Sequence, residues 1–223
     1  MAKKTEKSPK RGYFITLEGG EGVGKSTQIK LLAERLTSAG IDVVMTREPG
    51  GNPQAEQIRE LLLSGDNDRW TPMTEALLMT ASRAEHVSRT IIPALSAGQW
   101  VVCDRFYDST IAYQGAARGL GMKKMRKLTS LVLGDFCPDL TFILDLPPSV
   151  GLPRALSREQ GKSLMEDRFE KLDLSFHEAM RKGFAKIAAN EPERCRMIDA
   201  DKPVEQIHEE IWAKLAKYCD ITP

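Results

Sequence analysis

The sequence predicts an α/β protein with a five-stranded parallel sheet, helices on both faces of the sheet and a short lid. Short apolar or β-branched runs alternate five times with longer segments whose apolar residues recur at helical spacing. The first run leads straight into a glycine-rich turn, and a helical pattern follows that turn. Strands that alternate with helices form parallel sheets, because each helix carries the chain back across one face by a right-handed crossover.

A phosphate-binding loop joins the first predicted strand, residues 13–17, to the first predicted helix, residues 27–39. The turn between them reads Gly, four residues, Gly-Lys-Ser. Its glycines let successive backbone N–H groups face one anion, Lys25 reaches the β- and γ-phosphates, and the Ser26 hydroxyl binds Mg²⁺. We expect a nucleoside triphosphate to contact Gly19, Gly20, Glu21, Gly22, Val23, Gly24, Lys25, Ser26 and Thr27.

Charged residues follow the next two predicted strands. A β-branched run at residues 42–46 precedes Glu48, and an apolar run at residues 100–103 precedes Asp104 and Arg105. In open α/β sheets, functional residues gather at the carboxyl ends of strands. Asp104 is suited to receive a proton or hold Mg²⁺ through water, and Arg105 to clamp a phosphate. The alternatives are a salt bridge that pins the strand end and, for Glu48, a solvated turn.

The longest helical pattern covers residues 73–97, and Pro93 is expected to bend or end that helix. Met79 and Arg83 lie four residues apart on one face, which offers an apolar platform and a bidentate donor. An earlier helix carries Arg59. The other predicted elements are helices at 54–63, 106–114, 123–133, from about 149, 172–188 and 204–218, strands at 140–146 and 197–198, and loops at 64–72 and 115–122.

Residues 154–168 form a basic segment of low hydrophobicity, which we term the lid. Arg154 and Arg158 share a helix face at i,i+4 spacing. A basic stretch of this kind can close over a bound nucleotide and bring arginines to the γ-phosphate. A solvated run of charge is the competing interpretation.

The composition is that of an ordinary globular chain, with 223 residues, 41% hydrophobic and 28% charged. We expect one domain at residues 13–223, preceded by a disordered basic tail at residues 1–12. The net charge of +1 predicts no nucleic-acid partner, and the lack of an apolar run of about 20 residues predicts no membrane partner. The scattered cysteines and histidines disfavour a metal site built from them and suit a reducing, cytoplasmic compartment.

The motifs together favour a kinase. The sequence has no N-K-x-D guanine-reading motif, so we expect the nucleotide to be ATP. Four arginines stand at predicted strand ends or on helices from which they can converge on a second, anionic substrate: Arg47, Arg59, Arg83 and Arg105. Phosphoryl transfer requires positive charge on the moving group, which Lys25, Mg²⁺ and arginines would supply.

Five segments resemble the bacterial thymidylate kinase family, and the resemblance runs from residue 13 to the last predicted helix. The segments are E-G-G-E-G-V-G-K-S-T, T-R-E-P-G-G, A-L-L-M-T-A-S-R-A-E-H-V, D-R-F-Y-D-S-T-I-A-Y-Q-G and D-R-F-E. The resemblance implies a P-loop NTPase fold and transfer of the γ-phosphate of ATP to dTMP, which gives dTDP. It also implies Mg²⁺ as cofactor and a homodimer.

The resemblance further implies how dTMP is bound. Arg59 and Arg105 would hold its phosphate, and Glu21 would position its sugar hydroxyl. Arg83 would bond a thymine carbonyl, and Tyr113 would crowd a ribose 2′-hydroxyl, which favours a deoxyribose by steric exclusion. The full implied set of substrate residues is Glu48, Arg59, Met79, Arg83, Arg105, Thr110, Tyr113 and Gln114.

Two positions distinguish this chain within the family that it resembles. Some members carry a catalytic arginine in the phosphate-binding loop, where this chain has Gly22, so the resemblance implies catalytic arginines in the lid, Arg154 and Arg158. Glu166 and Asp167 would help to organise Mg²⁺ or the closed lid. Met79 stands where the family usually has a phenylalanine that stacks on thymine; a thioether contacts a ring with about 0.3–1.5 kcal/mol but orients it less well.

Three alternatives remain open from the sequence. The first is a kinase for another pyrimidine monophosphate, such as dUMP or CMP, which would share the ATP half of the site. The second is a non-catalytic, regulatory ATP-binding module. The third, a nucleic-acid-binding ATPase, rests only on the basic tail at residues 1–12.

Overall fold

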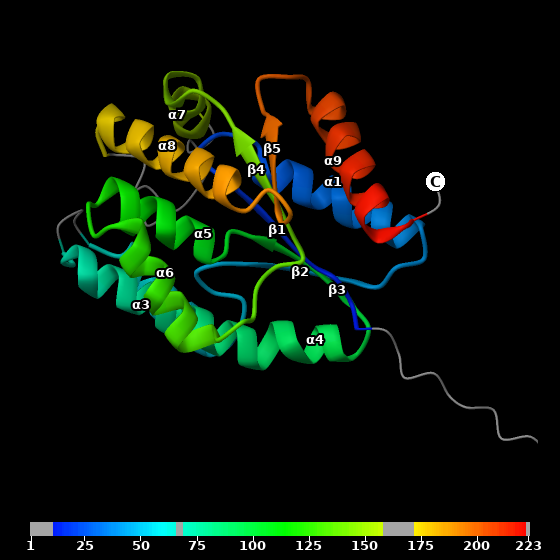
Figure 1. Ribbon diagram of the computed structural model, residues 1–223, viewed down its shortest axis with the longest axis horizontal. Coiled ribbons are helices and arrows are strands. Elements are labelled where there is room, and N and C mark those ends of the chain that lie inside the picture. Colours follow the sequence, from blue (N-terminus) through cyan, green and yellow to red (C-terminus); the bar gives the residue numbers. More distant parts are fainter. Residues whose placement is uncertain (1–10, 66–68, 158–171, 222–223) are drawn as a thin grey trace, which may run out of the picture.

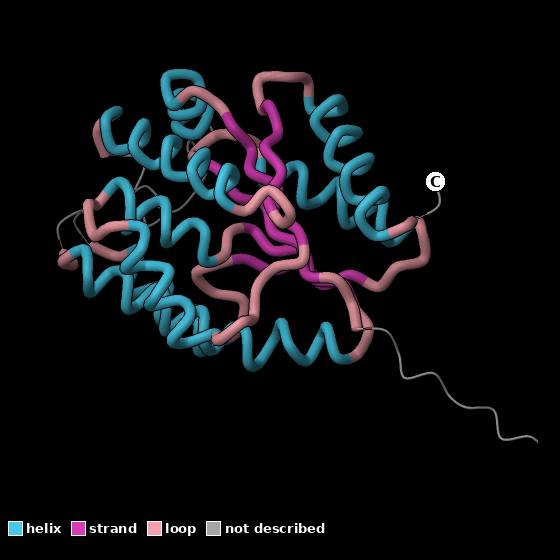
Figure 2. Tube along the Cα trace, in the orientation of Figure 1, coloured by secondary structure: helices cyan, strands magenta, loops and turns pink. Residues whose placement is uncertain are grey.

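Five parallel strands form the centre of the computed structural model, which describes residues 11–65, 69–157 and 172–221 (Figures 1 and 2). The strands are β1 (Phe14–Gly19), β2 (Val43–Arg47), β3 (Trp100–Asp104), β4 (Leu140–Asp145) and β5 (Cys195–Asp199). Their order is β2-β3-β1-β4-β5, and every neighbouring pair is parallel. The predicted five-stranded parallel sheet is confirmed.

Helices cover both faces of this sheet. They are α1 (Lys25–Ser38), α2 (Pro53–Leu63), α3 (Pro72–His86), α4 (Ile92–Ser96), α5 (Tyr107–Thr110), α6 (Met122–Leu133), α7 (Pro148–Leu156), α8 (Leu174–Asn190) and α9 (Val204–Cys219), with π-helices η1 (Val87–Ile91) and η2 (Ile111–Ala117). Helices α1 and α9 pack side by side over one face, and α3, α4, α5, α6 and α8 lie on the other (Figure 1). Each face has its own core, with Leu32 and Ile211 in one and Phe106 and Met180 in the other.

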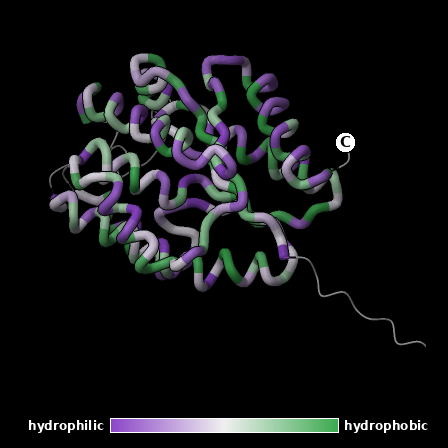
Figure 3. Tube along the Cα trace, in the orientation of Figure 1, coloured by the Kyte–Doolittle hydropathy of each residue, from purple (hydrophilic) through white to green (hydrophobic). Residues whose placement is uncertain are grey.

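The central position of β1 explains its sequence. All six of its residues are buried, because helices cover both of its faces, and strands of that kind read as continuous apolar runs. Helix α9 instead buries Ile207, Ile211 and Leu215. Hydrophobic and hydrophilic segments alternate along this helix (Figure 3). Strands β1 and β3 are parallel neighbours in the middle of the sheet, so their carboxyl ends lie side by side.

The segment predicted as one helix at residues 73–97 is helical through residue 96 but changes its winding on the way. It consists of α3, η1 and α4, and the Ile92 N–H donates to the Val87 carbonyl, five residues back. Pro93 lies in the first turn of α4. Because proline has no N–H and its ring clashes with the preceding turn of an α-helix, the wider π turn accommodates Pro93, and the helix ends only at Ser96.

Several element bounds differ from the prediction. Helix α1 begins at Lys25 and not at residue 27, because Gly24 caps the helix with a φ of 91°. The helical segment predicted for residues 106–114 continues through η2 to Ala117. At the start of the described chain, Arg11 pairs with Asp139 across distances of 2.7 and 3.0 Å.

Candidate active site

The phosphate-binding loop lies between β1 and α1. Gly22 and Gly24 have φ angles of 68° and 91°, in the left-handed region that glycine adopts without steric cost. Lys25 is 8% exposed, and its Nζ donates to the carbonyl oxygens of Gly20 at 2.8 Å and of Gly19 at 3.3 Å. The ammonium group therefore lies against the loop itself, at the N-terminus of α1, where an anion is electrostatically favoured.

Arg105 joins this loop to the end of β3. Its Nη1 donates to the Gly19 carbonyl at 2.9 Å, and its Nη2 donates to Glu21 Oε1 at 3.0 Å. Tyr113 donates its hydroxyl to the same Glu21 oxygen at 2.6 Å. Burial would raise the pKa of Glu21, but the charges of Arg105 and then Lys25 outweigh it and lower the pKa to about 2. Glu21 is thus a carboxylate at neutral pH, and Arg105 pairs with it rather than with Asp104.

The buried carboxyl group of Glu18 is linked to Arg105 through the hydroxyl of Ser109. Arg105 has a positive φ of 67°, which is costly for a side chain with a Cβ, and its Nη1 also donates to Ser109 Oγ at 3.1 Å. Ser109 Oγ in turn donates to Glu18 at 2.6 Å, and the Phe106 N–H donates to Glu18 at 2.7 Å. Burial, followed by the charge of Asp108, raises the pKa of Glu18 to about 7.

The donor set for Mg²⁺ comprises oxygen atoms at the same edge of the sheet. Asp104 Oδ1, at the end of β3, is buried and has no hydrogen-bond partner among the described residues. Ser26 is exposed in the first turn of α1. Magnesium prefers a small number of protein oxygens together with phosphate and water oxygens, so these residues fit the ion. Glu166, the third expected ligand, lies outside the described residues.

Arg83 lies in a second, buried part of the site. It is 3% exposed, its Nε donates to Glu48 Oε2 at 2.7 Å, and its Nη2 donates to Thr110 Oγ1 at 3.1 Å. The third nitrogen, Nη1, is buried and makes no hydrogen bond to any residue that the structure describes. Met79 is half-buried one turn earlier on α3. A buried donor without a protein acceptor is costly, so Arg83 fits a ligand with a carbonyl oxygen.

Other expected substrate residues are held by protein partners nearby. Gln114 Nε2 donates to Glu75 Oε1 at 2.8 Å, and Arg59 Nη1 donates to the Pro49 carbonyl at 2.8 Å. Tyr113 and Gln114 both lie in η2, a π-helix, and π-helical turns frequently mark functional sites. The solvated turn considered for Glu48 is excluded, because Glu48 is 5% exposed.

The structure brings together the phosphate loop, the strand ends and the α3 residues, but Arg154 of the lid lies apart from them. Arg154 is exposed at the end of α7, and its Nη2 lies 3.2 Å from Asp201 Oδ1. Arg158 lies outside the described residues, as does most of the segment at 154–168.

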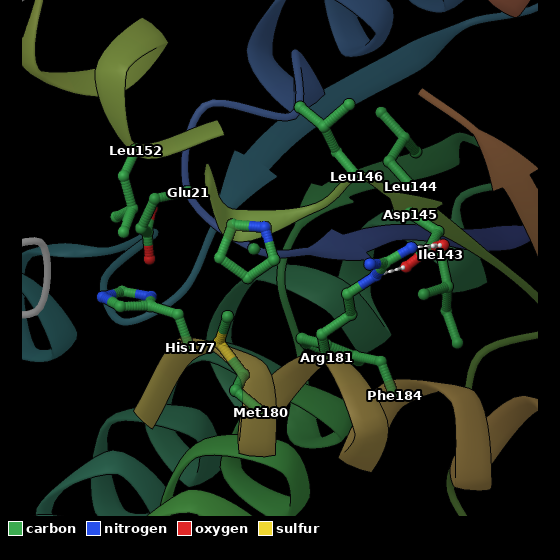
Figure 4. Close-up of a pocket in the computed structure, with 12 residues that line it drawn as sticks. Glu21, Ile143, Leu144, Asp145, Leu146, Leu152, His177, Met180, Arg181 and Phe184 are labelled. Carbon is green, nitrogen blue, oxygen red and sulfur yellow. Dashed lines mark hydrogen bonds and ion pairs between the residues drawn. The ribbon is translucent and has the colours of Figure 1, made fainter. Parts of the chain in front are cut away.

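A pocket that the sequence does not predict adjoins Glu21 (Figure 4). Its lining comes from the end of β4, from α7 and from α8, and it includes His177 and Met180. Arg181 and Asp145 close another part of the wall through two hydrogen bonds of 2.7 Å, drawn as dashed lines in Figure 4. Helix α7 also touches the phosphate loop, so this wall supports the position of Glu21.

Four polar residues at the site escape sequence reasoning: Glu18, His86, Ser109 and His177. His86 and His177 are 0% and 1% exposed, which agrees with the structural role that scattered histidines most often have. Glu18 is a single charge inside an apolar strand. The phosphate-loop match assigns no role to the residue before Gly19, so this isolated carboxyl group was the one available signal.

The fold and site define a class of protein. The site has a phosphate-binding loop, and the Arg105–Glu21 pair joins this loop to the part that contains Arg83. The buried Nη1 of Arg83 has no acceptor among the described residues. This combination is typical of a P-loop kinase that holds ATP next to a second substrate. The sequence profile of the thymidylate kinase family matches residues 17–211. The chain belongs to the thymidylate kinase family and is an ATP-dependent nucleoside monophosphate kinase that uses Mg²⁺.

Individual relatives agree with this assignment. The chain is 53% identical over 213 residues to a thymidylate kinase of Afipia carboxidovorans, which covers 95% of this chain and 92% of the relative. It is 53% identical over 197 residues to a thymidylate kinase of Caulobacter vibrioides, with 88% and 92% covered. A crystal structure of thymidylate kinase from Ehrlichia chaffeensis matches with a TM-score of 0.74 and 36% identity, over 92% of this chain and 98% of that one. These comparisons do not favour the alternatives that the sequence left open.

Proposed function

We propose that the chain transfers the γ-phosphate of ATP to dTMP, giving dTDP and ADP, as a step in dTTP synthesis. The observation that carries this proposal is the position of Arg105, which touches both the Gly19 carbonyl of the phosphate loop and Glu21. That guanidinium group would lie between the ATP half of the site and the half that would hold the second substrate. Positive charge at this place is what the transferring phosphoryl group requires.

The ATP half would act through the phosphate loop. Lys25 would exchange its bonds to the two loop carbonyls for the β- and γ-phosphates, and residues 19–27 would surround the phosphates. When bound by Ser26 and Asp104, with Glu166 from the lid, Mg²⁺ would supply charge neutralisation for the phosphate oxygens. Arg105 would balance the charge that spreads over the moving group, while an oxygen of the dTMP phosphate attacks the γ-phosphorus in line and ADP leaves.

The acceptor half would bind dTMP. Arg59 and Arg105 would hold its phosphate, and the carboxylate of Glu21 would accept a hydrogen bond from the sugar hydroxyl. Tyr113 is 5% exposed and donates to Glu21, so its ring would leave little room for a 2′-hydroxyl. Arg83 would donate from Nη1 to a thymine carbonyl. Glu48 would hold Arg83, and the base would lie among Met79, Thr110 and Gln114.

The lid would supply the remaining charge through Arg154 and Arg158. Support comes from Gly22, the position at which some family members carry the catalytic arginine. A Cβ there would lie 1.9 Å from the Gly151 carbonyl oxygen, so no side chain fits. On ATP binding Arg154 would leave Asp201, an exchange that costs little because exposed ion pairs contribute only about 0–1 kcal/mol.

We also propose that residues 13–223 form one domain and that two copies form a homodimer. Leu61, Leu77 and Leu131 are 44%, 50% and 84% exposed. They lie on α2, α3 and α6, and α3 packs against both of the other helices, so this apolar surface suits a second copy. No helix among the described residues could span a membrane. The free thiols of residues 103, 137, 195 and 219 suit the cytoplasm, where we place the enzyme.

The proposal is tested by ADP formation with ATP·Mg²⁺ and each of dTMP, dUMP, UMP, dCMP, AMP and GMP. We expect kcat/KM for dTMP to exceed the value for every other acceptor. A preference for another pyrimidine monophosphate would overturn the assigned base site, and no turnover with any acceptor would overturn the catalytic role. Sedimentation of the wild type and of Leu77→Glu tests the dimer, and an unchanged molecular mass between the two would count against this surface.

A further inference from the structure

His86 is a buried residue that the proposed reaction does not use, yet it reaches the base-binding part of the site. It is the last residue of α3 and is 0% exposed. The helix widens into η1 immediately after it, and such turns are frequent at functional sites. Its ring lies against the carboxyl group that holds Arg83.

Glu48 connects the two side chains. Its Oε2 accepts from Arg83 Nε at 2.7 Å, and its Oε1 lies 3.0 Å from His86 Nδ1. Because each oxygen has its own partner and all three side chains are buried, the carboxylate is held in one orientation. The Arg83 guanidinium group, bonded to Glu48 and Thr110, then has its remaining nitrogen directed one way.

Thr46 holds the other side of the imidazole ring. Its Oγ1 on β2 lies 2.7 Å from His86 Nε2. Gly51 covers this contact, since a Cβ there would lie 2.4 Å from His86 Nε2 and 2.6 Å from Thr46 Oγ1. The ring is thus enclosed between β2 and the turn that follows Glu48, and it has no room to rotate.

The hydrogen-bond partners determine where the ring carries its proton. A carboxylate only accepts hydrogen bonds, so the contact with Glu48 requires a proton on His86 Nδ1. In the neutral ring Nε2 is then an acceptor, and the Thr46 hydroxyl is its donor. A proton on Nε2 alone would place two lone pairs against each other at Glu48.

We propose that His86 and Thr46 are positioning residues for base recognition: they fix Glu48, and through it they fix the direction of the Arg83 Nη1 donor toward the base of the monophosphate substrate. The proposal rests on the proposed function, because it assigns the selectivity of that same site. It makes the base pocket depend on the Thr46 side chain in β2, so loss of the Thr46 hydroxyl weakens binding of the monophosphate and leaves ATP binding unchanged.

The first test is the protonation of the ring in the wild-type enzyme, measured by long-range ¹H–¹⁵N NMR of ¹⁵N-histidine-labelled protein, with His86→Asn to assign the signal. We expect a proton on Nδ1. A ring protonated on Nε2 alone would overturn the proposal, whatever the enzyme phosphorylates.

The second test compares His86→Leu with His86→Asn, whose amide nitrogen can replace Nδ1 as the donor to Glu48. For His86→Leu we expect the Kd and KM for dTMP to rise about tenfold, with kcat within about twofold and the KM for ATP unchanged. His86→Asn should recover most of the affinity. A general structural fault would move the two substrates together, and equal KM values for dTMP in wild type and His86→Leu would overturn the proposal.

A milder pair covers the case in which His86→Leu does not fold. Thr46→Val removes the hydroxyl and keeps the shape, whereas Thr46→Ser keeps the hydroxyl. We expect Thr46→Val to raise the Kd for dTMP about threefold and Thr46→Ser to leave it unchanged; identical values in both overturn the role of Thr46. If the wild type fails to phosphorylate dTMP, the proposed function fails instead, and the two outcomes are separated by that one control.

Discussion

Gly22 of the phosphate loop lies directly against Gly151 of α7, so closely that a Cβ at position 22 would lie 1.9 Å from the Gly151 carbonyl oxygen. Gly24, two residues on, also has a positive φ, but nothing lies within 4 Å of its Cβ position. A substitution at Gly24 therefore introduces backbone strain alone, whereas a substitution at Gly22 introduces backbone strain and a steric clash with α7. Gly24→Ala should lower the free energy of unfolding by about 1–2 kcal/mol, and Gly22→Ala by about 2 kcal/mol more, because α7 must shift. Urea unfolding of both variants checks this, and equal losses would contradict the contact.

Replacement of Arg105 by lysine should lower kcat strongly. Lysine cannot bond Gly19, Ser109 and Glu21 together, as Arg105 does, and the loss of a preorganised donor costs about 10²–10³ in rate. Arg181→Lys is the matched control, because Arg181, like Arg105, pairs with a carboxylate, that of Asp145, through its guanidinium group, but has no proposed contact with a phosphate. Steady-state kinetics should show near wild-type kcat for the control; a similar loss in both variants would argue against a catalytic role for Arg105.

Met79→Phe should tighten dTMP binding. Met79 is half-buried on the same face of α3 as Arg83, and a phenyl ring stacks on a base with about 0.5–1.5 kcal/mol beyond area burial. We expect the Kd and KM for dTMP to fall a few-fold. Titration calorimetry measures this directly, with Leu77→Phe, at a 50% exposed position of the same helix, as the control. An unchanged Kd in Met79→Phe would mean that the base does not lie over this face.

Glu18 should make the stability of the protein fall as the pH rises. Burial and Asp108 raise its pKa from 4.5 to about 7 in the folded state, so between these values the folded protein holds a proton that the unfolded chain releases. The free energy of unfolding then decreases through this window. Glu18→Gln removes the effect, and its stability relative to the wild type should increase from pH 4.5 to pH 8, on the order of 3 kcal/mol. Denaturant unfolding across pH, with the exposed Glu60→Gln as control, tests this; curves that stay parallel would refute it.

Arg154→Ala should lower kcat by about 10³-fold or more if the lid supplies charge to the transfer, in line with the effect of catalytic arginines in related reactions. Asp201→Asn removes the partner of Arg154 and leaves the arginine in place. We expect this control to keep wild-type kcat. If instead both variants lose the same activity, the ion pair and not the arginine's charge is what matters.

Much of the fold follows from local patterns in the sequence. The apolar run of β1 reflects burial on both of its faces, and the helical spacing of α9 reflects burial of one face. The glycine-rich turn between β1 and α1 is typical of a phosphate-binding loop. The π-helices do not follow in this way. The winding at Val87 accommodates Pro93, a residue from which the sequence predicts a bend or an end of the helix, and no local residue pattern marks the winding at Ile111.

Site residues that belong to a sequence motif could be predicted. Site residues whose role depends on a partner far away in the sequence could not. Lys25 stands in the phosphate-loop motif at the start of α1, and Arg105 directly follows β3, so both are found by position alone. The link between Glu48 and Arg83 joins residues 35 positions apart, and Glu18 meets Ser109 across 91 positions. Such contacts are set by the order of the strands, so the partner of a polar residue in an apolar run cannot be identified until the fold is known.

The bonds from Lys25 to Gly19 and Gly20 bear on the thermodynamics of nucleotide binding. Because the side chain already fastens the turn, the loop is preorganised, and ATP exchanges one set of hydrogen bonds for another. Ordering a flexible loop would cost about 1–2 kcal/mol of conformational entropy for each residue, whereas here that loss accompanies folding. Binding of ATP to the loop should therefore resemble docking on a rigid surface, with a small change in heat capacity.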